Sequence, residues 1–300
     1  MPGAPLRARV WIPNIHVRAM TVPSASASSS SPIAFIGGGN MARSLIGGLL
    51  SGGIDRTRIR VAEPDARTRA GLAEDFGVAC YAGADEAAPE AGTWVFAVKP
   101  QVMRQVCESL APVAQSRRPL VVSIAAGITS TQLERWLGGG LAVVRAMPNT
   151  PALLGAGITG LFANARVDAA GREHAAGLLE SAGQTVWIAE EPLMDAVTAT
   201  SGSGPAYVFL LAEAMEDAAI AQGLPPDAAR VLAQQTILGA ARMLTASSEP
   251  PAELRRRVTS PNGTTQAAIE VLQAGGFDAL VARAIAAATR RGAELAAAND

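Results

Sequence analysis

The first part of the chain alternates short apolar runs with segments whose apolar residues recur at helical spacing. This alternation is typical of a parallel β-sheet with crossover helices. The expected buried strands are residues 33–36, 59–62, 94–98, 120–124 and 142–146. The expected helices lie near 40–52, 66–76, 101–114 and 130–137, and residues 158–162 and 185–188 add edge strands. We therefore predict an α/β domain over residues 32–191.

Beyond residue 195 the strand pattern ends and helical periodicity takes over. Pro205 stands where the first turn of a helix tolerates proline, and Gly223 is placed to end the helix that follows. Further helices are expected near 226–245, from a cap at Thr264 to about residue 274, and from Phe277 onward, with a loop at 247–251. Residues 195–300 are thus predicted to form an all-α domain.

The helix expected over residues 207–221 is apolar around most of its circumference. Its polar side chains are mainly Glu213, Glu216 and Asp217. A helix of this kind must be buried on several sides. Either it forms the centre of a bundle within one chain, or it interlocks with a second subunit.

Residues 1–31 contain three arginines, many serines and no acidic residue. They lack the apolar core of a secretory signal. We interpret them as a disordered leader, or as an upstream extension of a chain that starts at Met20. The alternative is an organelle transit peptide, which has the same acid-poor composition.

Composition narrows the function. The chain is 49% hydrophobic and 17% charged with a formal net charge of −1, so it lacks the basic surface that nucleic-acid binding requires. Cys80 and Cys107 are not spaced for a metal site and suit a reducing compartment. We interpret both as small core residues in preference to reactive thiols. No apolar run has the length of a membrane span. We expect a cytoplasmic protein with no metal and no nucleic-acid or membrane partner.

Residues 37–42, Gly-Gly-Gly-Asn-Met-Ala, follow the first strand and open the first helix. They match the dinucleotide fingerprint Gly-x-Gly-x-x-Gly/Ala. Gly37 allows a tight turn, Gly39 lets the backbone approach a pyrophosphate, and Ala42 lets helix and strand pack closely. The free N–H groups at the helix start would bind the pyrophosphate. This segment predicts a dinucleotide cofactor.

Glu63 follows the second strand, where the adenosine ribose of a dinucleotide usually lies. Its carboxylate would accept hydrogen bonds from a ribose hydroxyl and repel a 2′-phosphate. Arg67 or Arg69, in contrast, could bind that phosphate. A solvated acid at a strand end is the simpler alternative for Glu63. These residues therefore leave the choice between NADPH and NADH open.

Candidates for acid–base catalysis are few. His16 and His174 are the only histidines, and His16 lies in the leader, so a histidine general acid has almost no candidate. Lys99 is the only lysine and stands at the carboxyl end of a central strand, where ligands bind in open α/β sheets. We assign Lys99 to the ribose or phosphate region of the cofactor, in preference to a surface cap or a catalytic acid.

Residues 258–268 read Val-Thr-Ser-Pro-Asn-Gly-Thr-Thr-Gln-Ala-Ala. Hydroxyl residues flank a Pro-Asn-Gly turn that leads into a helix. Backbone N–H groups and hydroxyls should therefore converge on one point, which suits an anionic carboxylate. A simple capping loop would explain Thr264, but not the density of hydroxyls on both sides of the turn.

Three more motifs accompany these: Val-Val-Ser-Ile-Ala-Ala-Gly at 121–127, Arg-Ala-Met-Pro-Asn-Thr-Pro at 145–151 and Ser-Gly-Ser-Gly-Pro-Ala-Tyr at 201–207. Together the segments resemble the pyrroline-5-carboxylate reductase family, from about residue 33 to residue 294. The resemblance implies an α/β Rossmann-type domain followed by an all-α dimerisation domain, with the active site between them. It also implies a homodimer with interwoven helices, which often assembles further into a ring, and reduction of 1-pyrroline-5-carboxylate to L-proline.

The resemblance also implies NADPH as the cofactor, with NADH as the alternative, and it implies site residues. Cofactor contacts fall at Ile36, Gly37, Gly38, Gly39, Asn40, Met41, Glu63, Ala97, Val98, Lys99, Pro100, Ile124, Ala125 and Ala126. The substrate loop contains Thr259, Ser260, Gly263, Thr264 and Thr265. As a hypothesis, Thr265 binds the ring nitrogen of the imine, N–H groups near 263–265 hold the carboxylate, and residues 125–126 and 147–149 shape the nicotinamide side. A protonated imine is a strong electrophile, so positioning can replace a histidine acid.

The sequence departs from the family pattern at two positions, and two other functions remain as alternatives. Asn262 stands where the family loop commonly has glycine, although asparagine also adopts left-handed conformations. Glu63 stands where members that use NADPH often carry a small hydroxyl residue. A dehydrogenase of the β-hydroxyacid or 6-phosphogluconate type would need a lysine in the second domain, and residues 195–300 contain none. A catalytically idle NADP-binding regulator would not need the hydroxyl-rich loop.

Overall fold

The computed structural model describes residues 31–299. These residues form two compact units. The sheet unit comprises residues 31–207 and 279–299, and the helical unit comprises residues 208–278. The predicted leader lies outside the described residues except for Ser31.

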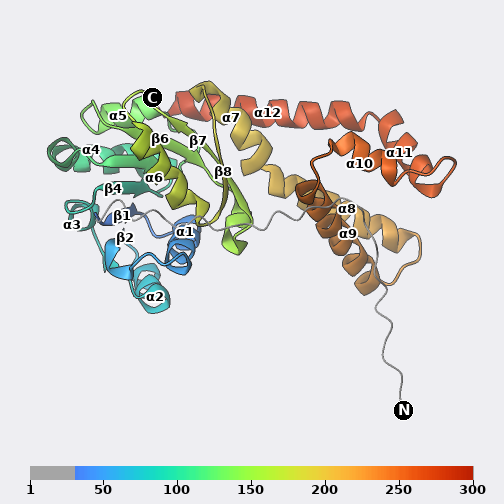
Figure 1. Cartoon of the computed structure of the whole chain (residues 1–300), viewed down its shortest axis with the longest axis horizontal. Coiled ribbons are helices and arrows are strands. Elements are labelled where there is room, and N and C mark those ends of the chain that lie inside the picture. The colour runs from blue at the N-terminus through green and yellow to red at the C-terminus, as the bar shows by residue number, and fades with distance from the viewer. Residues whose placement is uncertain (1–30, 300) are drawn as a thin grey trace, which may run out of the picture. The chain divides into compact units, whose positions relative to one another are not determined.

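The sheet has eight strands in the order β3-β2-β1-β4-β5-β6-β7-β8 (Figure 1). The strands are β1 Ile33–Ile36, β2 Ile59–Ala62, β3 Ala79–Tyr81, β4 Thr93–Phe96, β5 Leu120–Ser123, β6 Val143–Met147, β7 Gly157–Ala163 and β8 Gly183–Trp187. All neighbours from β3 to β6 are parallel. The chain order reverses between β1 and β4, as in Rossmann-type sheets, so this part of the predicted fold class is confirmed.

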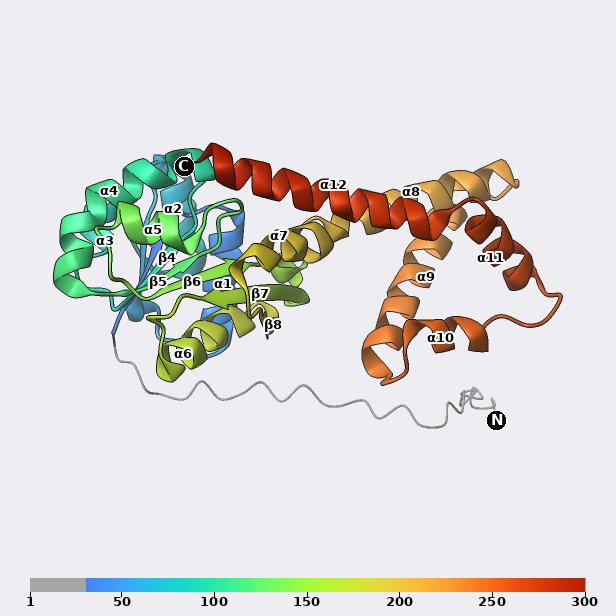
Figure 2. The same cartoon turned by 90° about the horizontal axis from the view of Figure 1, so that it is seen from above.

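Helices cover both faces of the sheet. One face carries α1 Asn40–Ser51, α2 Ala66–Phe76 and α6 Ala169–Glu180, and the other carries α3 Ala84–Ala87, α4 Pro100–Arg117 and α5 Ser130–Trp136. Figure 2 shows α4 and α6 on opposite sides of the strands. Successive side chains of a strand point to opposite faces. Phe35 therefore packs with the α1 side, whereas Ile36 packs with the α4 side, and both are buried.

The second half of the sheet differs from the predicted pattern. β7 runs antiparallel to β6, because the two strands are joined by a short 3₁₀ segment, Thr150–Leu154, and not by a crossover helix. β7 is also an interior strand, and the edges of the sheet are β3 and β8. The sequence pattern missed β3, α3 and α6, and it extended β4 and β5 beyond their ends. A 3₁₀ turn, Arg56–Arg58, precedes β2.

A short segment leads from the sheet to the long helices. It comprises a 3₁₀ turn Glu191–Leu193, α7 Met194–Val197 and a π-helical turn Thr198–Gly202. The amide of Asn149 donates to the carbonyl of Ser201 at 3.1 Å, and the Tyr207 hydroxyl donates to the carbonyl of Ala199 at 3.0 Å. The first bond joins the π-helical turn to the segment after β6, and the second joins it to the start of the helix that follows.

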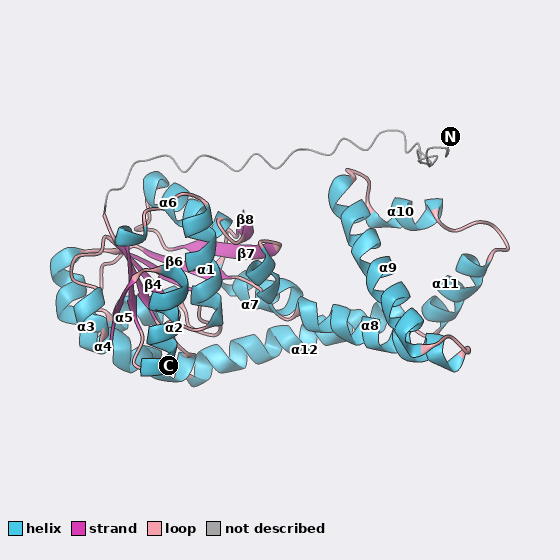
Figure 3. Ribbon diagram, turned by 90° about the horizontal axis from the view of Figure 1, so that it is seen from below, coloured by secondary structure: helices cyan, strands magenta, loops and turns pink. Residues whose placement is uncertain are grey.

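The remaining elements are α8 Gly204–Ala221, α9 Pro226–Ala246, α10 Pro251–Arg257, α11 Thr264–Ala274 and α12 Phe277–Ala298. Figure 3 shows α9, α10 and α11 as helices joined by loops. The all-helical prediction is confirmed, although α10 was not predicted. Within residues 31–299 no single helix has the length and apolarity to cross a membrane; α11 and α12, bent by 52°, meet that criterion only as a pair.

Candidate active site

The carboxyl ends of β1, β4 and β5 lie side by side and carry the predicted cofactor segments. The N–H of Ala97 donates to the carbonyl of Ile36 at 2.8 Å, and the N–H of Ile124 donates to that of Phe96 at 3.0 Å. In open α/β sheets, ligands bind at this edge where the strand order reverses. The structure therefore brings residues 36–41, 97–100 and 124–126 to one edge of the sheet.

The glycine turn has the geometry that a dinucleotide requires. Gly37 has φ +106°, and a Cβ there would lie 2.7 Å from the carbonyl oxygen of Ala97, so no other residue fits. Gly39 faces open space and is the N-cap of α1, where no side chain caps the helix. The first N–H groups of α1 thus remain available to an anion. These residues fit the pyrophosphate of a dinucleotide.

Glu63 lies directly against this turn. Its carboxylate accepts hydrogen bonds from the N–H groups of Gly38 and Asp65, each at 2.9 Å. The guanidinium of Arg69 donates to the carbonyls of Glu63 and Pro64 at 2.7 and 3.1 Å. Arg69 is therefore used by the turn itself, whereas Arg67 is exposed on α2. The carboxylate of Glu63 thus lies beside the glycine turn, next to the region where the ribose is predicted to bind.

Lys99 and the loop after β5 complete this edge. Lys99 is exposed and is the N-cap of α4, with Pro100 as the first helical residue. Residues 124–126 are half-buried, and the Ala125 N–H faces the Ser123 hydroxyl at 3.4 Å. Gly127 has φ +70°, and a Cβ there would lie 3.2 Å from Leu295 of α12. The end of α12 thus packs against the loop that was predicted to contact the cofactor.

The structure also reveals polar residues at this unit that the sequence did not single out. Buried Arg145 forms an ion pair with Glu191 at 2.9 Å. Glu191 also accepts hydrogen bonds from the N–H and hydroxyl of Ser130, both at 2.6 Å. Burial raises the pKa of nearby Asp195, and the charge of Arg145 opposes this effect. The cluster joins β6 and α5 to the segment that leads into the long helices.

The hydroxyl-rich loop belongs to the helical unit. The Thr259 hydroxyl donates to the carbonyl of Arg255 at 2.7 Å, so its proton is directed back to α10. The Gly263 N–H donates to the carbonyl of Ser260 at 3.0 Å and closes a turn. Asn262 has φ +58°, a left-handed conformation. The turn thus places Asn262 where glycine would be least strained.

The start of α11 is exposed to ligands. Gly263 is the N-cap in an extended conformation, and Thr264 is already helical, so the prediction that Thr264 caps the helix is wrong by one residue. No side chain caps this end of α11, and the first N–H groups of a helix have no intrahelical partner. Residue 265 is half-buried at this end. The N-terminus of α11 therefore offers N–H donors and hydroxyls together.

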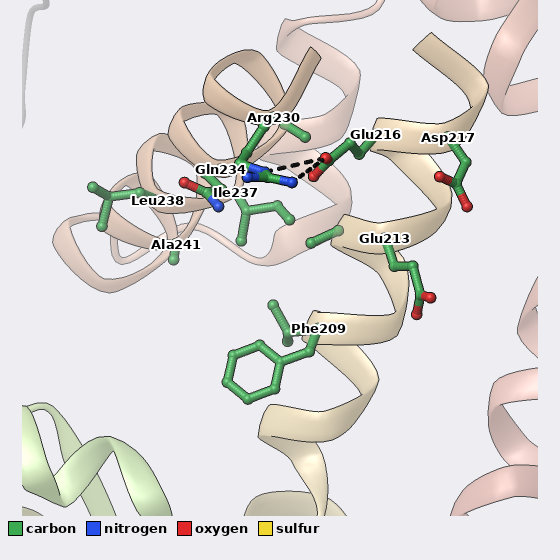
Figure 4. Close-up of a pocket in the computed structure, with 12 residues that line it drawn as sticks. Phe209, Glu213, Glu216, Asp217, Arg230, Gln234, Ile237, Leu238 and Ala241 are labelled. Carbon is green, nitrogen blue, oxygen red and sulfur yellow. Dashed lines mark hydrogen bonds and ion pairs between the residues drawn. The ribbon is translucent and has the colours of Figure 1, made fainter. Parts of the chain in front are cut away.

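An open groove of about 740 Å³ lies between α8 and α9 in the helical unit (Figure 4). Apolar side chains, including Phe209 and Ile237, line it together with an ion pair between Arg230 and Glu216 at 3.2 Å. None of the eighteen residues of α8 is buried within this chain, although the helix is strongly apolar. The bundle-centre alternative therefore does not hold for a single chain.

Comparisons with known proteins cover almost the whole described chain. Residues 191–295 match the family described as "Pyrroline-5-carboxylate reductase dimerisation", and residues 32–127 match "NADP oxidoreductase coenzyme F420-dependent". The pyrroline-5-carboxylate reductase of Pseudomonas aeruginosa is 53% identical over 268 residues, which cover 89% of this chain and 98% of that protein. The Vibrio alginolyticus enzyme of the same name is 41% identical, over 88% of this chain and 97% of its own.

Solved structures agree with these matches. A pyrroline-5-carboxylate reductase from Coxiella burnetii has a TM-score of 0.86 and 42% identity, over 89% of this chain and 99% of that chain. The Plasmodium falciparum enzyme, solved with NADP bound, has a TM-score of 0.78 and 28% identity, over 89% of this chain and 98% of that chain. The resemblance inferred from the motifs is confirmed. The chain therefore belongs to the pyrroline-5-carboxylate reductase family of NAD(P)H-dependent oxidoreductases.

Proposed function

We propose that this chain reduces 1-pyrroline-5-carboxylate to L-proline with NADPH or NADH, the last step of proline biosynthesis. The observation that carries the proposal is the uncapped start of α11 beside the hydroxyl-rich turn. It offers a carboxylate-binding site in a chain whose sheet unit has the glycine turn of a dinucleotide site. The relatives named above have this activity in their names.

The proposed cofactor site uses the sheet edge. The N–H groups that follow Gly39 hold the pyrophosphate, Glu63 lies at the adenosine ribose, and Lys99 lies near the ribose or phosphates. Residues 36–41, 97–100 and 124–126 together form the contact surface. When bound, the reduced nicotinamide supplies the hydride for the imine carbon.

The proposed substrate site uses the helical unit. The N–H groups of Thr264 and Thr265 hold the carboxylate, because the N–H of Gly263 already donates to the carbonyl of Ser260. Thr259 and Ser260 border the turn, and the Thr265 hydroxyl bonds the ring nitrogen. Reacting atoms must come within about 3–3.5 Å of each other. The chemistry therefore requires the loop of this chain, or of its partner, to meet the nicotinamide during turnover.

The role of Thr265 is consistent with the lack of a suitable histidine. His174 lies on α6, and its Nε2 is 2.9 Å from the hydroxyl of Thr93, the first residue of β4. That is the amino edge of the sheet, opposite the proposed cofactor edge. Burial also lowers the pKa of His174, so the protonated form that could donate a proton is less populated. His16 lies outside the described residues.

The proposed active form is a homodimer in which α8 is covered by a second copy. The side chains of Phe209 and Leu210 are 67% and 65% exposed in one chain, which is costly for large apolar groups at this density. The match of residues 191–295 to a dimerisation family supports this assembly. A ring of dimers is the proposed further assembly. We also propose that residues 32–191 form the cofactor domain and 195–300 the dimerisation and substrate domain of a cytoplasmic enzyme.

Steady-state kinetics test the proposed function. The purified chain, and a version that begins at Met20, should oxidise NADPH or NADH only when 1-pyrroline-5-carboxylate is present, with L-proline as the product. Equal activity of both versions would show that residues 1–19 are dispensable. No substrate-dependent oxidation with either cofactor would contradict the proposal.

A further inference from the structure

A chain of two hydrogen bonds runs along the first turns of α11. The N–H of Asn262 donates to Oε1 of Gln266 at 2.8 Å. The Nε2 of Gln266 donates to Oε1 of Glu270 at 2.7 Å. Residues spaced by four lie on one face of a helix, so Glu270 fixes which end of the Gln266 amide points toward the turn.

Asn262 is a residue that needs such support. Asn262 and Arg118 are the only residues other than glycine with positive φ between residues 31 and 299. Pro261 precedes Asn262, and the turn closes from Gly263 to Ser260, the pattern of a turn that prefers glycine at the third position. Asparagine adopts this conformation less readily than glycine, so the bond from Gln266 stabilises the turn.

The conformation of this turn also determines where α11 begins. A Cβ on Gly263 would lie 3.1 Å from the carbonyl oxygen of Ser260, so the N-cap and the turn are closely packed. If the turn changed its conformation, the N-cap would move with it. The first N–H groups of α11 would then no longer point to a common position.

We propose that Gln266 is a positioning residue that holds the Asn262 turn, and through it the donors that bind the substrate carboxylate. This inference rests on the proposed function. Gln266 does not touch the substrate in this scheme, and it acts only through the N–H of Asn262. Its side chain is half-buried and Glu270 is exposed, so the pair is not part of a hydrophobic core.

Kinetics of three variants of the full-length protein test this role. Gln266→Met keeps the size of the side chain and removes the acceptor; we expect the KM for 1-pyrroline-5-carboxylate to rise about five- to tenfold, the effect of one hydrogen bond. Glu270→Ala removes only the second bond and should raise this KM about twofold. Gln273→Met, the same change on the same helix, should leave it unchanged.

Two further measurements separate positioning from a general structural defect. The inhibition constant of L-proline, which carries the same carboxylate, should rise in the order Gln273→Met, Glu270→Ala, Gln266→Met. The KM for the dinucleotide and kcat should stay within about twofold of their wild-type values, because the proposed cofactor site lies on the other unit. The melting temperature should stay within a few degrees of wild type.

Two outcomes would overturn the inference. One is an unchanged KM for the imine in Gln266→Met. The other is a loss of kcat with the KM for both imine and dinucleotide altered together, which indicates a structural defect. Wild-type activity with the imine is measured in the same series, so a failure of the proposed function is recognised separately from a failure of this inference.

Discussion

The two proposed binding regions are held in different ways. The glycine turn follows β1, whose four residues are all buried, and it is backed by hydrophobic clusters on both faces of the sheet. The hydroxyl-rich loop lies between α10 and α11, which contain no buried residue in the described chain. The sheet unit thus stabilises its site with its own core. The helical unit depends on local hydrogen bonds and, in our proposal, on a second chain.

The largest expected effect comes from the rigid region. Gly37→Ala combines an unfavourable φ with a Cβ 2.7 Å from Ala97, so the free energy of unfolding should fall by about 2–5 kcal/mol and dinucleotide binding should be lost. Gly39→Ala meets no protein atom within 4 Å and should leave the melting temperature unchanged, yet it should weaken dinucleotide binding, because the Cβ occupies the space proposed for the pyrophosphate. Thermal melts and dinucleotide titrations of both variants check this. A wild-type dinucleotide affinity in Gly39→Ala would show that the pyrophosphate does not bind next to Gly39.

The next effect concerns the helical region. Leu210→Asp places a charge on a side chain that is 65% exposed in one chain and, in our proposal, buried in the dimer. The free energy of dimerisation should become less favourable by about 2–4 kcal/mol, as for other central interface residues, and the dimer dissociation constant should rise accordingly. Val186→Asp, on the edge strand β8 and 47% exposed, is the control. Light scattering over a concentration series measures both. A dimer as tight as wild type in Leu210→Asp would place the interface elsewhere.

A moderate effect is expected at the loop. Thr265→Ala should lower kcat/KM by about 1–3 kcal/mol of transition-state stabilisation, the range for a hydrogen bond to a charged group. Thr245→Ala is a matched control, since that hydroxyl bonds only to carbonyls within α9. Full activity in Thr265→Ala would exclude the hydroxyl from the mechanism.

The smallest effect concerns cofactor choice. Glu63→Ser removes a negative charge next to the glycine turn, so the binding free energy of NADPH relative to NADH should improve by about 1 kcal/mol, the energy of two unit charges about 4 Å apart in bulk water. Binding of each dinucleotide to the free protein, measured at low and high salt, tests this. An unchanged ratio of the two affinities would mean that the 2′-phosphate lies away from Glu63.

The sequence predicted the regular parts of the fold for a clear physical reason. Strands such as β1 are buried on both faces and appear as short apolar runs, so their positions were predicted correctly. α6 was missed because most of its apolar residues are alanines, so its hydrophobic face is weak. The direction of β7 was not predicted, although the link between β6 and β7 is too short for a crossover helix and so indicates an antiparallel strand.

The same contrast applies to the sites. The fingerprint at 37–42 is local, so both its position and its geometry followed from the sequence. The bonds of Glu63 to Gly38 and of Gln266 to Asn262 depend on side-chain conformations that no spacing rule specifies. The ion pair of Arg145 with Glu191 joins residues far apart in the chain, and only the fold brings them together.

The end of the chain has a practical consequence for anyone who handles this protein. The amide of Gln132 donates to the carbonyl of Ala296 at 3.0 Å, and the amide of Asn299 donates to that of Gly127 at 3.3 Å. Ala296, near the end of α12, therefore contacts α5, and Asn299, just after α12, contacts the loop that follows β5. An affinity tag or fusion partner at the C-terminus would begin directly after these residues and would be expected to disturb the two hydrogen bonds.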